Sequence, residues 1–499
     1  MESLISAIFG ELTTRSINFF ISKLSKPTTL DVEDRLRRVL LRAQVIIDEA
    51  KGRHITNQAM LLQLVMLGDA VHWSHYVLDT FRCQLHQEED ANNQGVSRSS
   101  SLSKVNSAMR MRLYSRGAKT FKDLQGALDN LSSMILEVNE LVLFLSSYPR
   151  MYRPPYSMHL QLANCMFGLQ LEAQLVINFL LHVQPHGSDE ELEVLPIVGP
   201  GYVGKSTLVA HVCKDERVRA RFSEILFFHI QTFTDDELAT FRDECELKHQ
   251  NRVSESNLEA RLLVVIELIG DLINEEAWGR LYSASKRYAP RGSKIIVTSR
   301  FDSIVKFGTT RALTLKFLPH EAYWYFFKTL TFGSMDPEMH PRLTHLAMEI
   351  AKTTLGRLAH LLSANIIAHL LKDNFDVKFW SELLAFLRRY SQKLVSQFGG
   401  HPFASSNQNR PVPFGRMSTP SEDIVLYHRC QHPSEEEIPK IKFQDVLCGS
   451  VMPRGKFDVL AWRSRIPPYY SYVHTCEIEG QKTRAVKRKR SMKNGVTNC

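Results

Sequence analysis

The residues best suited to chemistry form a glycine-rich run that begins at Gly199. Residues 199–207 read Gly-Pro-Gly-Tyr-Val-Gly-Lys-Ser-Thr and match the pattern GxxxxGK[ST] at every specified position. This motif needs a strand before it and a helix after it, because the loop N–H groups and the helix N-terminus together face phosphate oxygens. The apolar run 194–198 and the helical stretch 208–212 meet that need. The sequence therefore predicts a polyphosphate-binding loop (P-loop).

The side chains of this loop have separate predicted roles. Lys205 can reach the β- and γ-phosphates of a nucleotide, and the Ser206 hydroxyl can ligate Mg²⁺. The glycines allow the backbone to approach the phosphates closely. The predicted cofactors are therefore ADP or ATP with Mg²⁺, held by Gly199, Gly201, Val203, Gly204, Lys205, Ser206 and Thr207, with Ser206 as the metal ligand.

An acidic residue at the end of a second buried strand normally completes such a site. The apolar run 262–266 predicts this strand, and Glu267-Leu-Ile-Gly-Asp271 follows it. Two registers are open: the strand ends at Glu267, or it continues and ends at Asp271. In the second register Glu267 lies within the strand and needs a partner if it is buried. The usual acidic pair is incomplete in both registers, so we expect hydrolysis to be slow or undetectable.

A further strand is predicted at 292–299, directly before Arg300. The C-terminal ends of parallel strands line the ligand crevice of a sheet. Arg300 is therefore a candidate to face the γ-phosphate, although an arginine after a strand is more often a solvated loop residue.

Composition places these motifs in an ordinary folded protein. The 499 residues, 44% apolar and 23% charged, are enough for about three domains. No run is apolar enough to span a membrane, and no signal peptide is predicted. The eight scattered cysteines suggest reduced thiols inside a cell. Seven basic residues of the +9 chain lie in 481–499, so residues 1–480 carry only +2 and no specific nucleic-acid partner is predicted.

Hydrophobic periodicity predicts a multidomain fold of α and α/β parts. Four amphipathic stretches, the first at Leu4–Leu12, predict a four-helix bundle, and short apolar runs alternating with helices predict a parallel α/β sheet. Helical periodicity then returns, and an irregular region follows with strand-like pieces at Lys442–Leu447 and Phe457–Trp462. The predicted regions are a helical domain at 1–147, a P-loop nucleotide-binding domain at 160–318, a helical subdomain at 319–395, a loop-rich region with short strands at 396–480, and a basic disordered tail at 481–499.

The order of these pieces resembles the NB-ARC module of plant disease-resistance proteins over residues 166–360. The resemblance is strong at the P-loop and at 292–300, which is close to the family's GSKIIVTTR. It is weaker at 167–172 (hhGRExE in the family), at 318–327, and at 355–359, where Arg357 replaces the adenine-packing proline of GLPLA. Residues 271–278 resemble the run after the family's acidic pair. This likeness favours Asp271 as the catalytic acid.

The flanking regions resemble the same family. The first 145 residues are similar to its coiled-coil, Rx-type four-helix domain, and Asp79 lies where the acidic EDVID-like stretch would be. Residues 319–395 correspond to an ARC-like subdomain. No MHD motif follows these helices, and no leucine-rich repeats are found in the sequence.

The resemblance implies an ADP/ATP-dependent signalling switch in plant defence, in which exchange of ADP for ATP releases the N-terminal helices. Implied partners are other defence proteins, bound through those helices, and further copies of the chain. Two alternatives stay open: a slow ATPase, and a non-switching adaptor or decoy that acts through its helical N-terminus. The expected location is the cytoplasm. Lys487–Arg490 could instead serve nuclear import, a hypothesis that we weigh equally with a solvated tail of no role.

Overall fold

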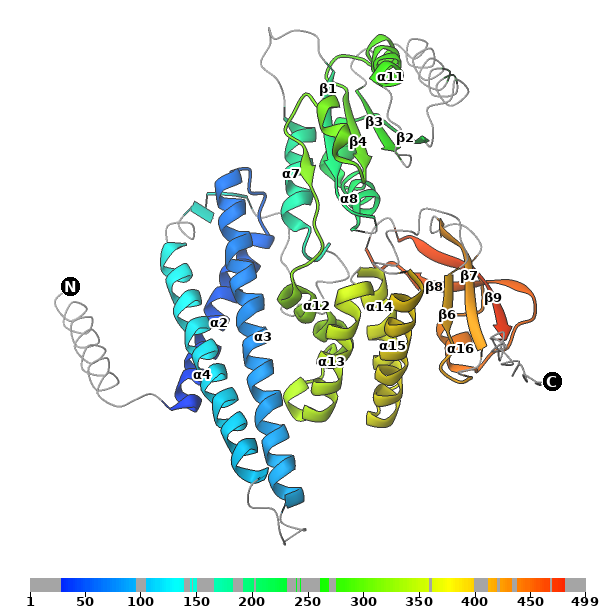
Figure 1. Ribbon diagram of the computed structural model, residues 1–499. Coiled ribbons are helices and arrows are strands. Elements are labelled where there is room, and N and C mark those ends of the chain that lie inside the picture. Colours follow the sequence, from blue (N-terminus) through cyan, green and yellow to red (C-terminus); the bar gives the residue numbers. More distant parts are fainter. Residues whose placement is uncertain are drawn as a thin grey trace, which may run out of the picture. The chain divides into compact units, whose positions relative to one another are not determined.

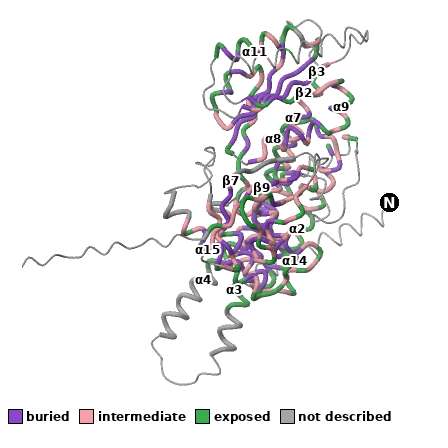
Figure 2. Tube along the Cα trace, turned by 90° about the vertical axis from the view of Figure 1, so that its right-hand side faces the viewer, coloured by how far each residue is buried: buried purple, intermediate pink, exposed green. Residues whose placement is uncertain are grey.

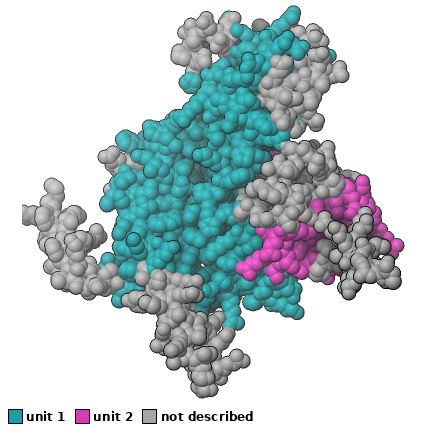
Figure 3. Space-filling view, in the orientation of Figure 1, with its two compact units in different colours: residues 1–384, 464–469 teal, residues 385–463, 470–499 magenta. Residues whose placement is uncertain are grey.

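The fold was examined in a computed structural model of the 499-residue chain. The structure describes residues 28–95, 105–138, 144–145, 147–149, 166–182, 192–230 (except 202), 239, 243, 261–268, 275–358, 361–398, 412–419, 422–432, 438–466 and 469–480. The predicted helix at Leu4–Leu12, Asp271 and the basic tail at 481–499 lie outside this description. The chain divides into two compact units, residues 1–384 with 464–469 and residues 385–463 with 470–499 (Figure 3).

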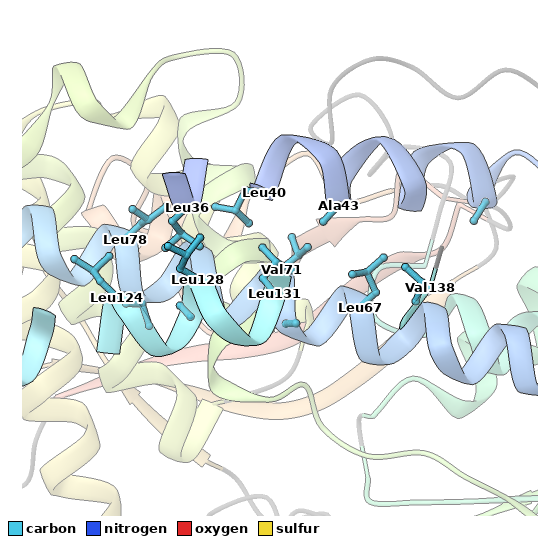
Figure 4. Close-up of a cluster of buried hydrophobic side chains, with 14 of the residues drawn as sticks. Leu36, Leu40, Ala43, Leu67, Val71, Leu78, Leu124, Leu128, Leu131 and Val138 are labelled. Atoms are coloured by element: carbon cyan, nitrogen blue, oxygen red, sulfur yellow. The ribbon is translucent and has the colours of Figure 1, made fainter. Parts of the chain in front are cut away.

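Three long helices near the N-terminus pack side by side (Figure 1). They are α2 (Thr29–Lys51), α3 (Gln58–Gly95) and α4 (Val105–Glu137). A capping box starts α2, because the Thr28 hydroxyl accepts a hydrogen bond from the Asp31 backbone N–H and the Asp31 carboxylate accepts one from the Thr28 N–H. Leucines and small residues at helical spacing point into a shared core (Figure 4), among them Leu36, Leu40, Ala43, Leu67, Val71, Leu78, Leu124, Leu128 and Leu131.

A parallel sheet of five strands in the order β2-β3-β4-β1-β5 forms the next layer, which confirms the predicted α/β fold. Most residues of β1, β3 and β4 are buried (Figure 2), because helices cover both faces of such a sheet. This burial explains why the strands are almost continuously apolar. The strands are β1 (Glu193–Val198), β2 (Glu224–Ile230), β3 (Leu262–Leu268), β4 (Lys294–Ser299) and β5 (Leu313–Thr314).

The two faces of the sheet have separate hydrophobic cores. One face packs against α7 (Gln170–Leu181), α8 (Lys205–Val212) and α9 (Glu216–Arg221), and the other against α11 (Glu275–Tyr288). Buried Lys294 of β4 links α7 to the sheet. Its Nζ lies 2.7 Å from the Glu193 carboxylate and donates to the carbonyl oxygens of Phe179 and His182. The ion pair satisfies a lysine that would otherwise be costly to bury.

Four helices follow the sheet: α12 (His320–Phe332), α13 (Pro341–Leu358), α14 (Leu361–Asp373) and α15 (Val377–Phe398). Helix α12 packs against α3 of the N-terminal bundle. At this contact the Asp79 carboxylate accepts hydrogen bonds from Trp324 Nε1 at 2.8 Å and from Lys328 Nζ at 2.5 Å. Each of these buried polar groups therefore has a hydrogen-bond partner.

The second unit contains an antiparallel sheet in the order β6-β7-β9-β8. Its elements are β6 (Val412–Gly415), β7 (Glu422–His432), α16 (Phe443–Cys448), β8 (Lys456–Arg463) and β9 (Ser471–Gly480). The sequence predicts only short strands in an irregular region here. The strand at Phe457–Trp462 is confirmed within β8. The strand predicted at Lys442–Leu447 is wrong, because Phe443, Val446 and Leu447 follow helical spacing in α16 and bury one face.

Arg416 is a buried charged residue of this unit. It is only 1% exposed, and its guanidinium pairs with Glu422 at 2.5 Å while Nε donates to the Val446 carbonyl. Arg416 therefore joins the turn after β6 to α16. Among the residues that the structure describes, no helix has the length and apolar character needed to cross a membrane.

Candidate functional site

The P-loop joins the end of β1 to the start of α8, the context that the motif requires. Gly199 has φ +154°, and a Cβ at this position would lie 2.6 Å from the Leu315 carbonyl oxygen. Gly204 caps α8 with φ +105°, a conformation that side chains disfavour. Both positions therefore need glycine, and the tight turn that results leaves the N-terminus of α8 open to a ligand.

Lys205 is the first residue of α8, and its side chain folds back over the loop. Nζ donates to the carbonyl oxygens of Gly199 and Pro200, at 2.7 and 2.8 Å. Burial lowers the pKa of Lys205 to about 8; the Glu267 carboxylate opposes this shift, and the Arg300 guanidinium adds to it. A phosphate group would favour the charged amine and offer it stronger acceptors than two carbonyl oxygens.

Ser206, Glu267 and His229 form a chain of hydrogen bonds at the C-terminal edge of the sheet. The Ser206 hydroxyl donates to Glu267 Oε1 at 2.5 Å, and Glu267 Oε2 lies 3.1 Å from His229 Nδ1. His229 and Glu267 are direct neighbours in the β2–β3 register. Burial acts to raise the pKa of Glu267, but hydrogen bonds from His229 and Ser206 and the charges of His229 and Lys205 hold it below its ordinary value.

The structure therefore brings Glu267 to the P-loop. Strand β3 continues to Leu268, one residue beyond Glu267, and its pairing with β2 and β4 sets the direction of the carboxylate. The signal was present in the sequence, since a carboxylate in a buried apolar strand requires a partner. Asp271, which the family resemblance favours, lies outside the described residues, and its role stays a prediction.

Arg300 follows β4 at the same edge of the sheet. Its guanidinium lies over the Phe301 ring, 4.6 Å from the ring centroid, and it is close enough to depress the pKa of Lys205. Arg300 thus lies close enough to Lys205 for the two charges to interact. Direct contact of Arg300 with a phosphate stays a prediction, as do the backbone contacts assigned to Gly201, Val203 and Thr207.

The donor set fits Mg²⁺. Hydroxyl and carboxylate oxygens are the hard ligands that this ion prefers, and it commonly takes only one or two protein ligands alongside water and phosphate oxygens. Ser206 Oγ and Glu267 Oε1 already lie side by side. These two oxygens are the ones we expect to face the ion.

Comparison with known proteins agrees with this geometry. Residues 176–336 match the NB-ARC domain family. Disease resistance RPP13-like protein 4 of Arabidopsis thaliana is 23% identical over 321 residues, covering 60% of this chain and 36% of that protein. Disease resistance protein RGA2 of Solanum bulbocastanum is 27% identical over 207 residues, covering 38% of this chain and 20% of that protein. The chain thus spans about a fifth to a third of the length of these relatives.

A solved structure of C. elegans PCH-2 is also similar over 46% of this chain and 70% of that one, at 11% identity and a TM-score of 0.29. That likeness is too slight to support an argument. The sheet and its P-loop define a P-loop NTPase fold. The matched segment is an NB-ARC domain, and the chain is related to plant disease-resistance proteins.

Proposed function

We propose that this protein binds ADP or ATP with Mg²⁺ at the P-loop and acts as a nucleotide-dependent signalling switch in plant defence. The observation that supports this most directly is the convergence of Lys205, Ser206 and Glu267 on the glycine turn. Nucleotide-binding chemistry and an NB-ARC match coincide in the same residues.

In this proposal, phosphate oxygens of the nucleotide replace hydrogen-bond partners that the P-loop side chains have within the protein. Lys205 Nζ leaves the Gly199 and Pro200 carbonyl oxygens and donates to phosphate oxygens. The N–H groups at the start of α8 donate to the same polyphosphate. Ser206 Oγ and Glu267 Oε1 would hold Mg²⁺, which would neutralise charge on the phosphate oxygens. Arg300, at the same sheet edge, would sense the γ-phosphate.

Slow hydrolysis follows from the same contacts. In the nucleotide complex Glu267 Oε1 would face Mg²⁺ and Oε2 would keep its contact with His229, so neither oxygen would be free to act as a general base for water. Asp271 stays the predicted catalytic acid for whatever turnover exists. Function then depends on which nucleotide is bound, because a ligand shifts a conformational equilibrium only by its differential affinity for the two states.

The N-terminal helices would supply the output of the switch. We propose that they contact other defence proteins and further copies of the chain, in the cytoplasm. The observation that favours such coupling is the α3–α12 contact at Asp79, which joins the helical bundle directly to the helices that follow the nucleotide sheet.

The test of the site is Lys205→Ala, with ADP affinity measured by calorimetry in Mg²⁺. We expect a loss of about 1.5–3 kcal/mol, because a charge-assisted hydrogen bond of that worth is removed while the backbone turn remains. Lys214→Ala removes an exposed lysine just after α8 and is the matched control. Equal ADP affinity in wild type and Lys205→Ala would show the proposed site to be wrong.

The test of the switch is separate. Hydrogen exchange in α3 and α12 should differ between ADP-loaded and ATP-loaded protein, because one nucleotide must loosen what the other holds. Identical protection with both nucleotides, at full occupancy, would reject the switch while leaving nucleotide binding intact.

A further inference from the structure

A second pocket, of about 420 Å³, lies within the first compact unit and apart from the P-loop. Its walls come from α2, α3, α7 with the residues before it, the start of α12, and His211 and Arg217 of α8 and α9, and most of its lining is apolar. This volume falls within the range of sites that enclose small organic molecules. The pocket is therefore large enough to bind a compound of its own.

Three aromatic rings form one wall. His72 of α3 lies 5.4 Å from Phe167 and 5.0 Å from Tyr325 of α12 between ring centroids, and Phe167 stacks on Tyr325 at 6.1 Å. Burial, followed by the charge of Lys51, lowers the pKa of His72 to about 4, so its ring is neutral at pH 7. Within the described residues, the buried His72 Nδ1 has no hydrogen-bond partner. The faces of such rings attract cations.

The lining also contains two carboxylates that lack cationic partners. Glu172 of α7 is half-buried, and Asp69 of α3 is exposed at the mouth. Neither forms an ion pair within the part of the chain that the structure describes. The basic residues of the pocket do form such pairs, Lys51 with Asp48, Arg53 with Glu49 and Arg217 with Asp215. Burial and the charge of Asp69 raise the pKa of Glu172, a cost that a bound cation would relieve.

Gly68 gives independent evidence that the space is kept open. It lies inside α3, where glycine is less favourable than alanine by about 1 kcal/mol. A Cβ added at Gly68 would meet no atom within 4 Å, so close packing does not require the glycine. Gly68 also lines the pocket. A larger residue here would extend into the empty volume.

We propose that this pocket binds a small amphipathic amine, with its apolar body against His72, Phe167 and Tyr325 and its ammonium group beside Glu172 and Asp69. The unpaired carboxylates favour a cation over anions and over neutral compounds, and the ring wall and the open space at Gly68 suit its apolar body. The site takes residues from the helical bundle, from α7 and from α12. A bound amine would therefore stabilise their mutual packing in proportion to its occupancy.

The test uses the full chain and three probes of similar size: naphthylethylamine, naphthylethanol and naphthylacetate. Calorimetry should show the amine binding at least tenfold more tightly than the alcohol, and no binding of the carboxylate. Glu172→Gln combined with Asp69→Asn should reduce amine affinity to that of the alcohol. Gly68→Leu should abolish binding of both, whereas Gly68→Ala, which adds one methyl group, should retain it.

Equal affinity for the three probes would overturn the proposal, and so would amine binding that survives Gly68→Leu or no amine binding at millimolar concentration. ADP affinity and the unfolding temperature of each variant serve as folding controls, because none of the altered residues touches the P-loop. If Gly68→Leu unfolds, the carboxylate variant alone decides: unchanged amine affinity in it would reject the proposal.

Discussion

The P-loop and the α3–α12 contact both gather charged side chains around a carboxylate, but the two carboxylates are used differently. Glu267 has a side chain that is 29% exposed, and its partners Ser206 and His229 lie at the open edge of the sheet. Asp79 and its partner Lys328 are only 9% and 13% exposed, and Trp324 covers them. The first carboxylate can change partners when a ligand arrives. The second resists opening, because opening it leaves buried groups unpaired, and any release of the helical bundle has to overcome that cost.

The largest effect is expected from Asp79→Ala. It leaves the Lys328 ammonium and the Trp324 N–H without their acceptor, and breaking a buried pair from one side costs about 3 kcal/mol or more. Urea denaturation of the nucleotide-free protein should show this loss. Asp79→Asn keeps an acceptor for Trp324 and should lose less. Asp34→Ala, an exposed acid on α2, is the control for surface charge. A loss below about 1 kcal/mol in Asp79→Ala would contradict a contact that is costly to open.

A second prediction concerns stability at low pH. The pKa of His72 falls from 6.5 to about 4 in the folded protein, so the unfolded chain binds more protons between these values. The contribution of neutral His72 to the free energy of unfolding is therefore fully present above pH 6.5 and is lost as pH falls toward 4. Since one pKa unit is worth about 1.4 kcal/mol, His72 accounts for about 3 kcal/mol at most.

His72→Phe should remove this part of the pH dependence, measured as the slope of unfolding free energy between pH 6.5 and 4. His86→Gln, at an exposed position of α3, should leave the slope unchanged. For His229, at the edge of the parallel sheet, the pH dependence of stability has the opposite sign, because the hydrogen bond to Glu267 raises the pKa of His229. Its contribution is present below pH 6.5 and is lost as pH rises through the raised value. An unchanged slope in His72→Phe would contradict the prediction that His72 contributes to the loss of stability in acid.

The third prediction separates the two candidate acids. Glu267→Gln should remove most of the gain in ADP affinity that Mg²⁺ provides, about 1.5–3 kcal/mol, because a charged ligand is replaced by a neutral one. Affinity in EDTA should change little. Asp271→Asn should leave the Mg²⁺ effect in place, while Asp271→Ala should abolish residual hydrolysis if Asp271 is the catalytic acid. Loss of the Mg²⁺ effect in Asp271→Asn alone would move the metal ligand to that residue.

The smallest effect is expected from Glu338→Gln. Glu338 pairs with Arg82 and Arg37 beside the α3–α12 contact, but its side chain is 45% exposed. Water and salt screen such pairs, which typically contribute less than about 1 kcal/mol. Urea denaturation at low and high salt should show a small loss that salt diminishes. A loss as large as that of Asp79→Ala would mean that burial does not separate the two kinds of contact.

The sequence alone was enough to predict the P-loop and the sheet that presents it. The motif at 199–207 and the apolar runs of β1, β3 and β4 are local patterns, and backbone geometry turns local patterns into turns and strands. Short runs were less informative. The six residues of α16 suit either a strand or a helix by composition, and only packing of Phe443, Val446 and Leu447 into the second unit selects the helix.

Tertiary structure decided which side chains meet. Asp79 contacts Trp324 and Lys328, which lie more than 240 residues away in the sequence. The hydrophobic periodicity of either segment does not predict this contact. Glu267 reaches Ser206 because strand pairing fixes the direction in which each side chain of β3 points. The secondary structure of long periodic segments depends mainly on neighbours along the chain, so sequence can reveal it. The pairing of charges depends on which distant surfaces come into contact, and that is settled only when the chain has packed.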